Sequence, residues 1–219
     1  MGEICFDIET LGIDDENLDQ KVLEYFVNRE EGFKEKKGLY PFSGKIIAIS
    51  VLDIDKKLIE TFYHSSQVSL FDTGFVDDYS GFKRVFIVCD EKGIIKNFYD
   101  RVKNASRFIT FNGLRFDCPF ITFRAIINGI TPTRNINTPR FKKEEHYDIY
   151  DVLTLSGLIK GNSLDIYCKV FDIPSPKVNM SGKDVEKFYR EEKFLEIAKY
   201  CSLDVYSTFL LYQKIKDYF

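Results

Sequence analysis

The chain has 219 residues, of which 44% are hydrophobic, 16% aromatic and 30% charged, and its formal net charge is −3. This length and composition are typical of one globular domain with a full core and exclude a disordered or fibrous protein. The slight acidic excess argues mildly against a nucleic-acid or anionic-membrane partner, and no apolar run approaches the roughly 20 residues of a membrane-spanning helix.

The first 44 residues predict a strand followed by a helical excursion. Ile4–Ile8 is a short apolar run that we expect to form a strand, ending in a turn at Thr10–Gly12. Over residues 11–44 the chain is mostly polar, and its apolar side chains recur at helical spacing. This pattern predicts a helical excursion closed by Gly38 and Pro41.

Residues 44–88 predict mainly strands. Gly44–Leu52 and Lys57–Tyr63 have the apolar pattern of a two-stranded hairpin. Ser65–Gly81 is rich in Ser, Asp and Gly and predicts a surface loop. Val85–Val88 fits either an edge strand or an extended approach to the next helix.

The middle of the chain predicts a strand–helix unit. A helix is expected over about Lys92–Lys103, a strand at Arg107–Phe111 and a second helix over about Cys118–Asn128. Thr131–Arg140 contains two prolines and predicts a loop. From Asp148 onward the apolar period is almost entirely helical, with breaks at a glycine, at two prolines and near Ser181.

The last helix has the clearest pattern, an apolar stripe from Phe194 to Ile215 with a period of 3.6 residues. Strands first, a strand–helix unit in the middle and helices last predict a mixed α/β domain.

Five cysteines without a Cys-x-x-Cys pair favour free thiols in a reducing compartment, and Met1–Asp7 lacks the regions of a secretory signal. We therefore expect a cytoplasmic protein with no membrane partner.

Asp7 and Glu9 are the first candidates for chemistry. They lie two residues apart in the apolar first strand, so both carboxylates project from the same face. Two half-buried carboxylates repel each other unless a cation lies between them, and a hard divalent metal such as Mg²⁺ or Mn²⁺ fits best. The alternative is a strand-end pair that points to water, which is the better interpretation of the same pattern at Asp14–Glu16 and Asp184–Glu186.

Asp117 is the second candidate. It follows a predicted strand and an Asn112-Gly113 turn, near the start of a predicted helix, and Pro119 occupies a first-turn position where proline is tolerated. An N-cap residue without further function is the alternative.

Tyr200 and Asp204 are the third candidates. Their spacing places the phenol and the carboxylate on one face of the last helix, beside its buried stripe. Ordinary packing plus a surface acid would give the same pattern.

Taken in order, Phe6-Asp-Ile-Glu-Thr10, Asn112-Gly-Leu-Arg-Phe-Asp117 and Tyr200-Cys-Ser-Leu-Asp204 resemble the three motifs of the 3′-5′ exonuclease superfamily with four acidic residues and a tyrosine. The nearest likeness is to the proofreading exonuclease domain of family-B DNA polymerases and to their stand-alone relatives. The resemblance implies an α/β, RNase H-like fold in which helices flank a mixed central sheet. It also implies a single exonuclease domain over residues 1–219, which stands alone or serves a polymerase or repair partner.

The resemblance further implies a two-metal mechanism with Mg²⁺ or Mn²⁺, in which mononucleotides leave the 3′ ends of single-stranded DNA. Asp7 would bridge both ions, Glu9 and Asp204 would hold the ion that activates water, and Asp117 would act through water ligands on the other. Tyr200 would orient the attacking water, because a phenol with a pKa near 10 is a poor base at pH 7.

Three residues would contact the substrate by the same resemblance: Thr10, Leu11 and Asn112. An exoribonuclease on the same scaffold and a non-catalytic nucleic-acid-binding module are the alternative functions. The basic loop Thr131–Lys143 is a candidate for contact with the phosphate backbone, with a solvated loop as its alternative.

A rival third motif lies at His146–Asp151, because another branch of the superfamily uses His-x-x-x-x-Asp. This segment follows Asp117 by only about 30 residues and would leave the long final helix without a ligand to deliver. We therefore interpret His146, Asp148 and Asp151 as residues that support the site or begin a helix.

Overall fold

The computed structural model describes residues 2–66, 75–140, 142–175 and 182–219. The described strands are β1 (Glu3–Gly12), β2 (Gly44–Asp53), β3 (Leu58–Tyr63), β4 (Phe75–Tyr79), β5 (Phe82–Val88), β6 (Arg107–Thr110) and β7 (His146–Asp148). The described α-helices are α1 (Gln20–Val27), α2 (Phe33–Lys36), α3 (Glu91–Val102), α4 (Asp117–Ile127), α5 (Ile149–Leu153), α6 (Leu164–Val170), α7 (Val185–Arg190) and α8 (Phe194–Ile215).

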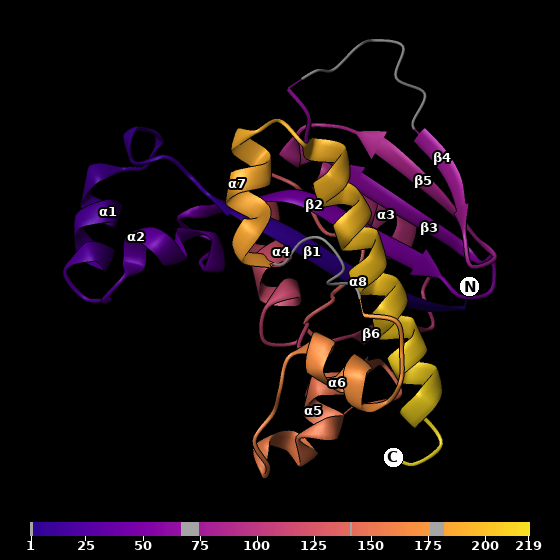
Figure 1. Cartoon of the computed structure of the whole chain (residues 1–219). Helices are drawn as coiled ribbons and strands as arrows, with labels where there is room; N and C mark the ends of the chain where they lie inside the picture. Colours follow the sequence, from indigo (N-terminus) through magenta and orange to yellow (C-terminus); the bar gives the residue numbers. More distant parts are fainter. Residues whose placement is uncertain (1, 67–74, 141, 176–181) are drawn as a thin grey trace.

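The strands form one mixed sheet of seven strands in the order β4-β5-β3-β2-β1-β6-β7 (Figure 1). β1 runs antiparallel to β2 and parallel to β6, so it lies near the middle of the sheet. Helices cover both faces, and the predicted α/β class with a mixed central sheet is confirmed.

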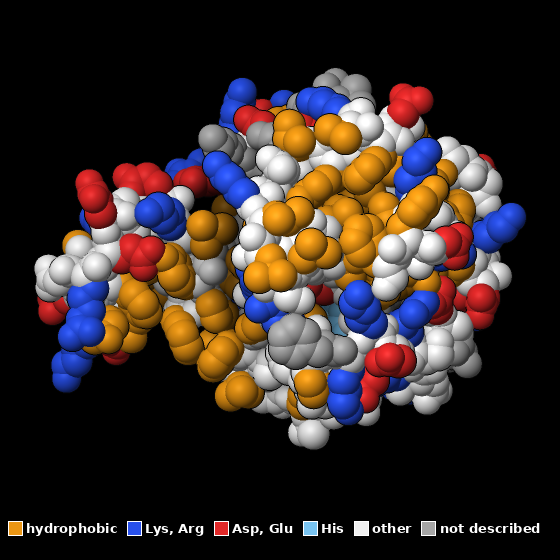
Figure 2. Space-filling view, turned by 90° about the horizontal axis from the view of Figure 1, so that it is seen from below, with side chains coloured by type: hydrophobic (Ala, Val, Ile, Leu, Met, Phe, Trp, Pro, Cys, Tyr) orange, Lys and Arg blue, Asp and Glu red, His pale blue; other side chains and the backbone are white. Residues whose placement is uncertain are grey.

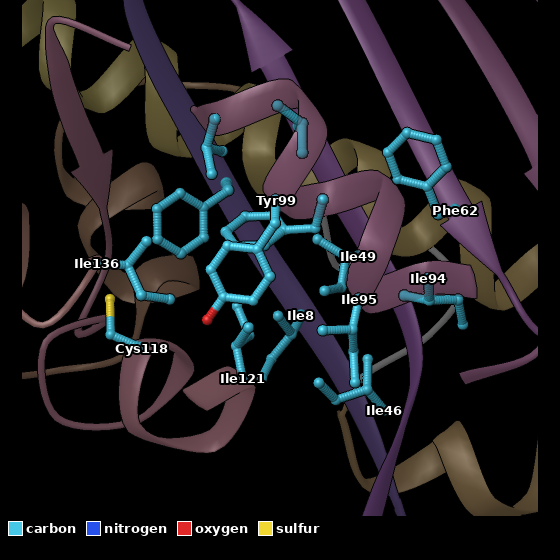
Figure 3. Packing of buried hydrophobic residues seen from close by; sticks show 14 of the residues in the cluster. Ile8, Ile46, Ile49, Phe62, Ile94, Ile95, Tyr99, Cys118, Ile121 and Ile136 are labelled. Carbon is cyan, nitrogen blue, oxygen red and sulfur yellow. The ribbon is translucent and has the colours of Figure 1, made fainter. Parts of the chain in front are cut away.

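The two faces of β1 meet different helices. Ile8 packs in a buried cluster with residues of α3 and α4, among them Ile95 and Ile121 (Figure 3). Phe6 belongs to the same cluster, and the Phe6 and Phe98 ring centroids are 5.2 Å apart. Because side chains alternate along a strand, Asp7 and Glu9 project from the opposite face, which α8 covers. The same alternation that buries the core therefore directs the acidic pair toward the last helix.

Four predicted boundaries or elements are corrected. The first strand does not turn at Thr10 but continues to Gly12, with a register shift between Glu9 and Thr10. The predicted loop Ser65–Gly81 contains β4, although its residues 67–74 lie outside the described chain. β4 pairs with β5, so Val85–Val88 belongs to a strand that is second from the edge. The residues just before Asp148, to which the sequence pattern assigns no element, form β7. The predicted breaks at Pro176 and Ser181 lie outside the described residues.

The excursion forms a small lobe beside the sheet (Figure 1), as the sequence predicts. Its own packing is aromatic: Phe26 stacks on Phe33 with 5.0 Å between the ring centroids, and Tyr40 packs against both rings. The Thr10 hydroxyl donates to the Gly38 carbonyl over 2.6 Å and ties the lobe to β1.

All five cysteines are free thiols: Cys5, Cys89, Cys118, Cys168 and Cys201. Among the described residues, the structure has no helix that is both long and apolar enough to cross a membrane. Figure 2 shows the molecule from below, with the lobe of residues 11–44 projecting to one side of the main body.

Candidate active site

Three carboxylates from the two ends of the sequence converge on one point. Asp7 and Glu9 of β1 and Asp204 of α8 each offer an oxygen, and these oxygens lie within 4.8 Å of one another. Glu9 is 8% exposed and Asp204 9% exposed. The strand alternation of β1 and the apolar stripe of α8 bring the three together, because packing the stripe on the sheet places Asp204 over the acidic pair.

Asp117 joins this group from the start of α4. Its Oδ1 accepts the backbone N–H of Ile8 over 3.1 Å, so the carboxylate lies against β1 between the positions of Asp7 and Glu9. Asp117 is the first residue of the helix and Phe116 is the N-cap, so the N-cap interpretation is wrong. The four acids that the sequence singled out are thus neighbours.

Burial and mutual repulsion perturb these acids. Desolvation raises the pKa of Asp7 and of Glu9 well above the ordinary carboxyl range, and the negative charges of Asp117 and Asp204 raise both further. Burial also raises the pKa of Asp117 to about 7, although two backbone hydrogen bonds oppose this shift. A group of buried carboxylate oxygens that repel one another in their anionic form has the ligand chemistry of a Mg²⁺ or Mn²⁺ site.

Two side chains of α8 flank the acids. Burial and the charges of Asp204 and Glu9 raise the pKa of Tyr200, which is also hydrogen-bonded to Asp204, so the phenol keeps its proton at neutral pH. Cys201 is fully buried, and its Sγ donates to the backbone oxygen of Asp7 over 3.5 Å. Sequence reasoning assigned Cys201 only a place in the apolar stripe, and no local signal indicates this contact.

The substrate candidates Thr10 and Leu11 line a cavity of about 360 Å³ beside Glu9. One wall of this cavity comes from the excursion, at Gly38, and another from α7, at Val185. The excursion and the acidic site are therefore neighbours in the fold.

All four cations in the candidate phosphate-binding loop have partners within the protein, and Lys143 donates to the backbone oxygen of Phe219 over 3.4 Å. Arg134 donates to the carbonyl of Ala105, Arg140 donates to Asp151 over 2.7 Å, and Lys142 pairs with Glu145 over 2.8 Å. These contacts tie the loop to the fold, so the structure favours neither a phosphate-binding loop nor a loop that is merely solvated.

The acids of the rival third motif are not among the three carboxylates that converge, although the charge of Asp148 contributes to the raised pKa of Asp117. His146 is 1% exposed, and its Nε2 is hydrogen-bonded to the Thr110 hydroxyl over 2.7 Å. Asp151 pairs with Arg115 and Arg140. Asp148 caps α5, as expected of a residue at a helix start.

We expect the metal-free protein to lose stability as the pH rises from 6.5 to 8. An unfolded aspartate titrates near pH 3.9, whereas Asp117 titrates with a pKa of about 7 in the folded protein. Between these values the folded state binds more protons, so its free energy of unfolding falls with rising pH. His146, whose pKa burial lowers to about 4, gives the opposite slope only below about pH 6.5.

Thermal melting in chelator at both pH values measures this effect. Asp117→Asn should reduce the fall in melting temperature. An equal fall in the variant and the wild type would contradict the assignment to Asp117.

Comparisons with known proteins identify the family and the fold of the chain. The model of a family described as "Predicted 3'-5' exonuclease related to the exonuclease domain of PolB" matches residues 40–218. The catalytic subunit of DNA polymerase epsilon from Schizosaccharomyces pombe is 24% identical over 186 residues, which are 80% of this chain and 8% of that protein. The structure of the family B DNA polymerase from the hyperthermophilic archaeon Pyrobaculum calidifontis matches with a TM-score of 0.62 and 17% identity over 98% of this chain and 24% of that chain.

The chain thus spans only a small part of the length of either polymerase. The family match includes Asp117, Tyr200 and Asp204 but begins after Asp7 and Glu9. The structure supplies what the match leaves out, since β1 places this pair beside Asp204.

Proposed function

Because the chain belongs to the family of predicted 3′-5′ exonucleases related to the exonuclease domain of PolB, we propose that it is a metal-dependent 3′-5′ exonuclease that releases mononucleotides from single-stranded DNA. The observation that carries this proposal is the convergence of Asp7, Glu9 and Asp204, with Asp117 against the same strand. Residues 1–219 would act as one exonuclease domain, and the five free thiols support a cytoplasmic location.

The four acids would hold two Mg²⁺ or Mn²⁺ ions, whose charge would balance four carboxylates. When bound, such ions supply an activated water and stabilise the charge that develops on the phosphoryl group. Because burial already disfavours the anionic form of Asp7 and Glu9 and raises the pKa of both, protons compete with the ions for these sites. The activity should therefore decline in acid.

Tyr200 would hold the attacking water by its hydroxyl group. Its raised pKa leaves the phenol protonated and suits it to orientation rather than proton removal. Thr10 and Leu11, which line the cavity beside Glu9, would contact the terminal nucleotide. The Thr10 hydroxyl is bound to Gly38, so its contact with the substrate would come through the backbone or the methyl group. Asn112 would contact the strand from the turn before α4.

Tyr200→Phe should lower kcat by about 10- to 100-fold, because it removes one orienting hydroxyl from the site and keeps the ring that packs on α7. The affinity for Mn²⁺ should change little, since a phenol is not among the carboxylate ligands. Steady-state kinetics with a labelled oligonucleotide checks the first expectation and calorimetry the second. A variant with the kcat of the wild type would remove Tyr200 from the mechanism.

The proposal is tested with matched single-stranded DNA and RNA oligonucleotides labelled at the 5′ end, each incubated with Mg²⁺ or Mn²⁺. A ladder that shortens from the 3′ end of DNA, and stops in chelator, is the expected result. Degradation of RNA alone would identify an exoribonuclease. Binding of either strand without shortening would identify a non-catalytic module.

A further inference from the structure

The segment His146–Asp151 forms hydrogen bonds with the turn that leads to Asp117. His146 binds Thr110 at the end of β6, and Asp151 Oδ1 accepts from the Arg115 guanidinium over 3.0 Å. Between them, Asp148 is 3% exposed and accepts backbone N–H groups of the same turn. Three residues of one short segment are thus hydrogen-bonded, in order, to the beginning, the middle and the end of residues 110–115.

The two oxygens of Asp148 have different partners. Oδ1 accepts the N–H groups of Asn112 over 2.9 Å, of Tyr150 over 3.0 Å and of Asp151 over 3.4 Å. Oδ2 accepts the N–H of Leu114 over 2.9 Å. One carboxylate therefore caps α5 and at the same time fixes the turn before α4.

This turn depends on its surroundings to hold its shape. Asn112 has a φ of +65°, a left-handed conformation that asparagine adopts more readily than most residues but less readily than glycine. Gly113 lies so close to β6 that a Cβ there would be 2.5 Å from the Thr110 Oγ1. A turn this crowded needs neighbouring groups to fix its shape, and Asp148 accepts two of the hydrogen bonds that do so.

The turn continues directly into α4, the helix that begins with Asp117. The N–H of Phe116 donates to the Asn112 carbonyl over 3.1 Å, and the N–H of Cys118 donates to the Gly113 carbonyl over 2.8 Å. Asp117 lies between these two anchored residues and reaches Ile8 with its Oδ1. A displacement of the turn would therefore move the Asp117 carboxylate relative to Asp7 and Glu9.

We propose that Asp148 is a positioning residue of the exonuclease site, which through the Asn112–Leu114 turn sets the place of Asp117 among the metal ligands and of Asn112 at the substrate. This inference rests on the proposed function for its catalytic consequence. The contacts that carry it are independent of that function, since all are hydrogen bonds within the protein.

Asp148→Asn is the specific probe. The asparagine oxygen can keep the three bonds at Oδ1, including the α5 cap, while its NH₂ group faces the Leu114 N–H and cannot accept from it. We expect about 10- to 100-fold weaker binding of Mn²⁺ and a similar fall in kcat, the usual effect of removing an outer-shell partner. Exchange of the Leu114 amide hydrogen should become at least about tenfold faster, because this N–H loses its acceptor.

Asp53→Asn is the matched control. Asp53 is also a buried aspartate, 8% exposed, and it accepts a turn N–H, that of Lys56, over 3.1 Å. It lies at the end of β2, paired with Ile4 and outside the stretch that pairs with Asp7 and Glu9. The control should keep the Mn²⁺ affinity and kcat of the wild type even if it melts at a lower temperature. A role in stability alone would make the two variants alike when both are measured well below their melting temperatures.

Asp148→Ser is the second variant if the asparagine protein does not fold, because serine can still cap α5 but is too short to hold the turn. Wild-type Mn²⁺ affinity, kcat and Leu114 exchange in a folded Asp148 variant would overturn the inference. If the wild type itself takes up no Mn²⁺ and degrades no DNA, the proposed function fails. The exchange rate then still decides whether Asp148 holds the turn.

Discussion

Asp204→Asn is expected to slow Mn²⁺-dependent shortening of a single-stranded DNA by at least about a thousandfold. Asp204 is the carboxylate that α8 brings to the acidic pair of β1. If it holds a metal ion as proposed, the lost contact costs several kcal/mol of transition-state stabilisation, of which each ~1.4 kcal/mol is a factor of ten. The rate of product formation from a 5′-labelled oligonucleotide measures the loss.

The melting temperature in chelator separates this effect from misfolding. The charge of Asp204 raises the pKa of Asp7 and of Glu9, so its removal relieves repulsion and the metal-free variant should melt at or above the wild-type temperature. Added Mn²⁺ should raise the melting temperature of the wild type and not of the variant. A variant that keeps its activity, or that melts far below the wild type, would contradict this assignment.

Phe6→Ala is expected to lower the free energy of unfolding by about 3–5 kcal/mol, the usual cost of emptying a buried aromatic site. Phe6 is 1% exposed, and its ring lies 5.2 Å from that of Phe98 and 5.6 Å from that of Phe108. For a chain of this size the melting temperature should fall by roughly 6–20 °C. Phe6 also precedes Asp7, so the core that it anchors fixes the strand that carries the acidic pair.

Phe123→Ala is the control, because Phe123 is 41% exposed on the outer side of α4. Its ring packs edge to face against Phe42 with 5.0 Å between the centroids, so its loss should lower the free energy of unfolding by only about 0.5–1.5 kcal/mol. Equal losses in the two variants would show that the β1 core does not carry the stability that its packing implies. Chemical denaturation of both proteins decides between these outcomes.

The sequence predicted best those parts of the molecule in which a strong period coincides with burial. The predicted apolar stripe begins at Phe194 and ends at Ile215, which are also the first and last residues of α8. The alternation around Asp7 predicted the face of both acids. The three acidic motifs then sufficed to predict which residues meet at one site. They meet because each motif falls on an element of the central sheet or on a helix that packs against it.

Other elements were missed because their cause is distant in sequence. β7 has only three residues, and it forms because it pairs with β6, whose partner residues lie 38 positions earlier, a contact that local pattern does not reveal. β4 likewise depends on pairing with β5 within a segment rich in turn-forming residues. The extension of β1 to Gly12 follows from its register with Gly44 of β2.

The basic loop Thr131–Lys143 shows that ion pairs between distant segments also cannot be predicted from local sequence. Arg140 has the pattern of an available cation in the sequence, yet Asp151 binds it in the fold. The acids in the His146–Asp151 segment were assigned correctly to a helix start, but their hold on the turn before Asp117 depends on the pairing of β6 with β7. Ion pairs and carboxylate bridges of this kind join segments whose proximity only the fold establishes.

The central claim is that acids from three separate segments form one divalent-metal site. The most direct measurement is a titration of Mn²⁺ into the protein, in which the electron paramagnetic resonance signal of the free ion reports what stays unbound, for the wild type and for Asp7→Asn. The wild type should take up Mn²⁺ and the variant should leave most of it free. A wild type that leaves all Mn²⁺ free, or a variant that binds as much as the wild type, would contradict the account.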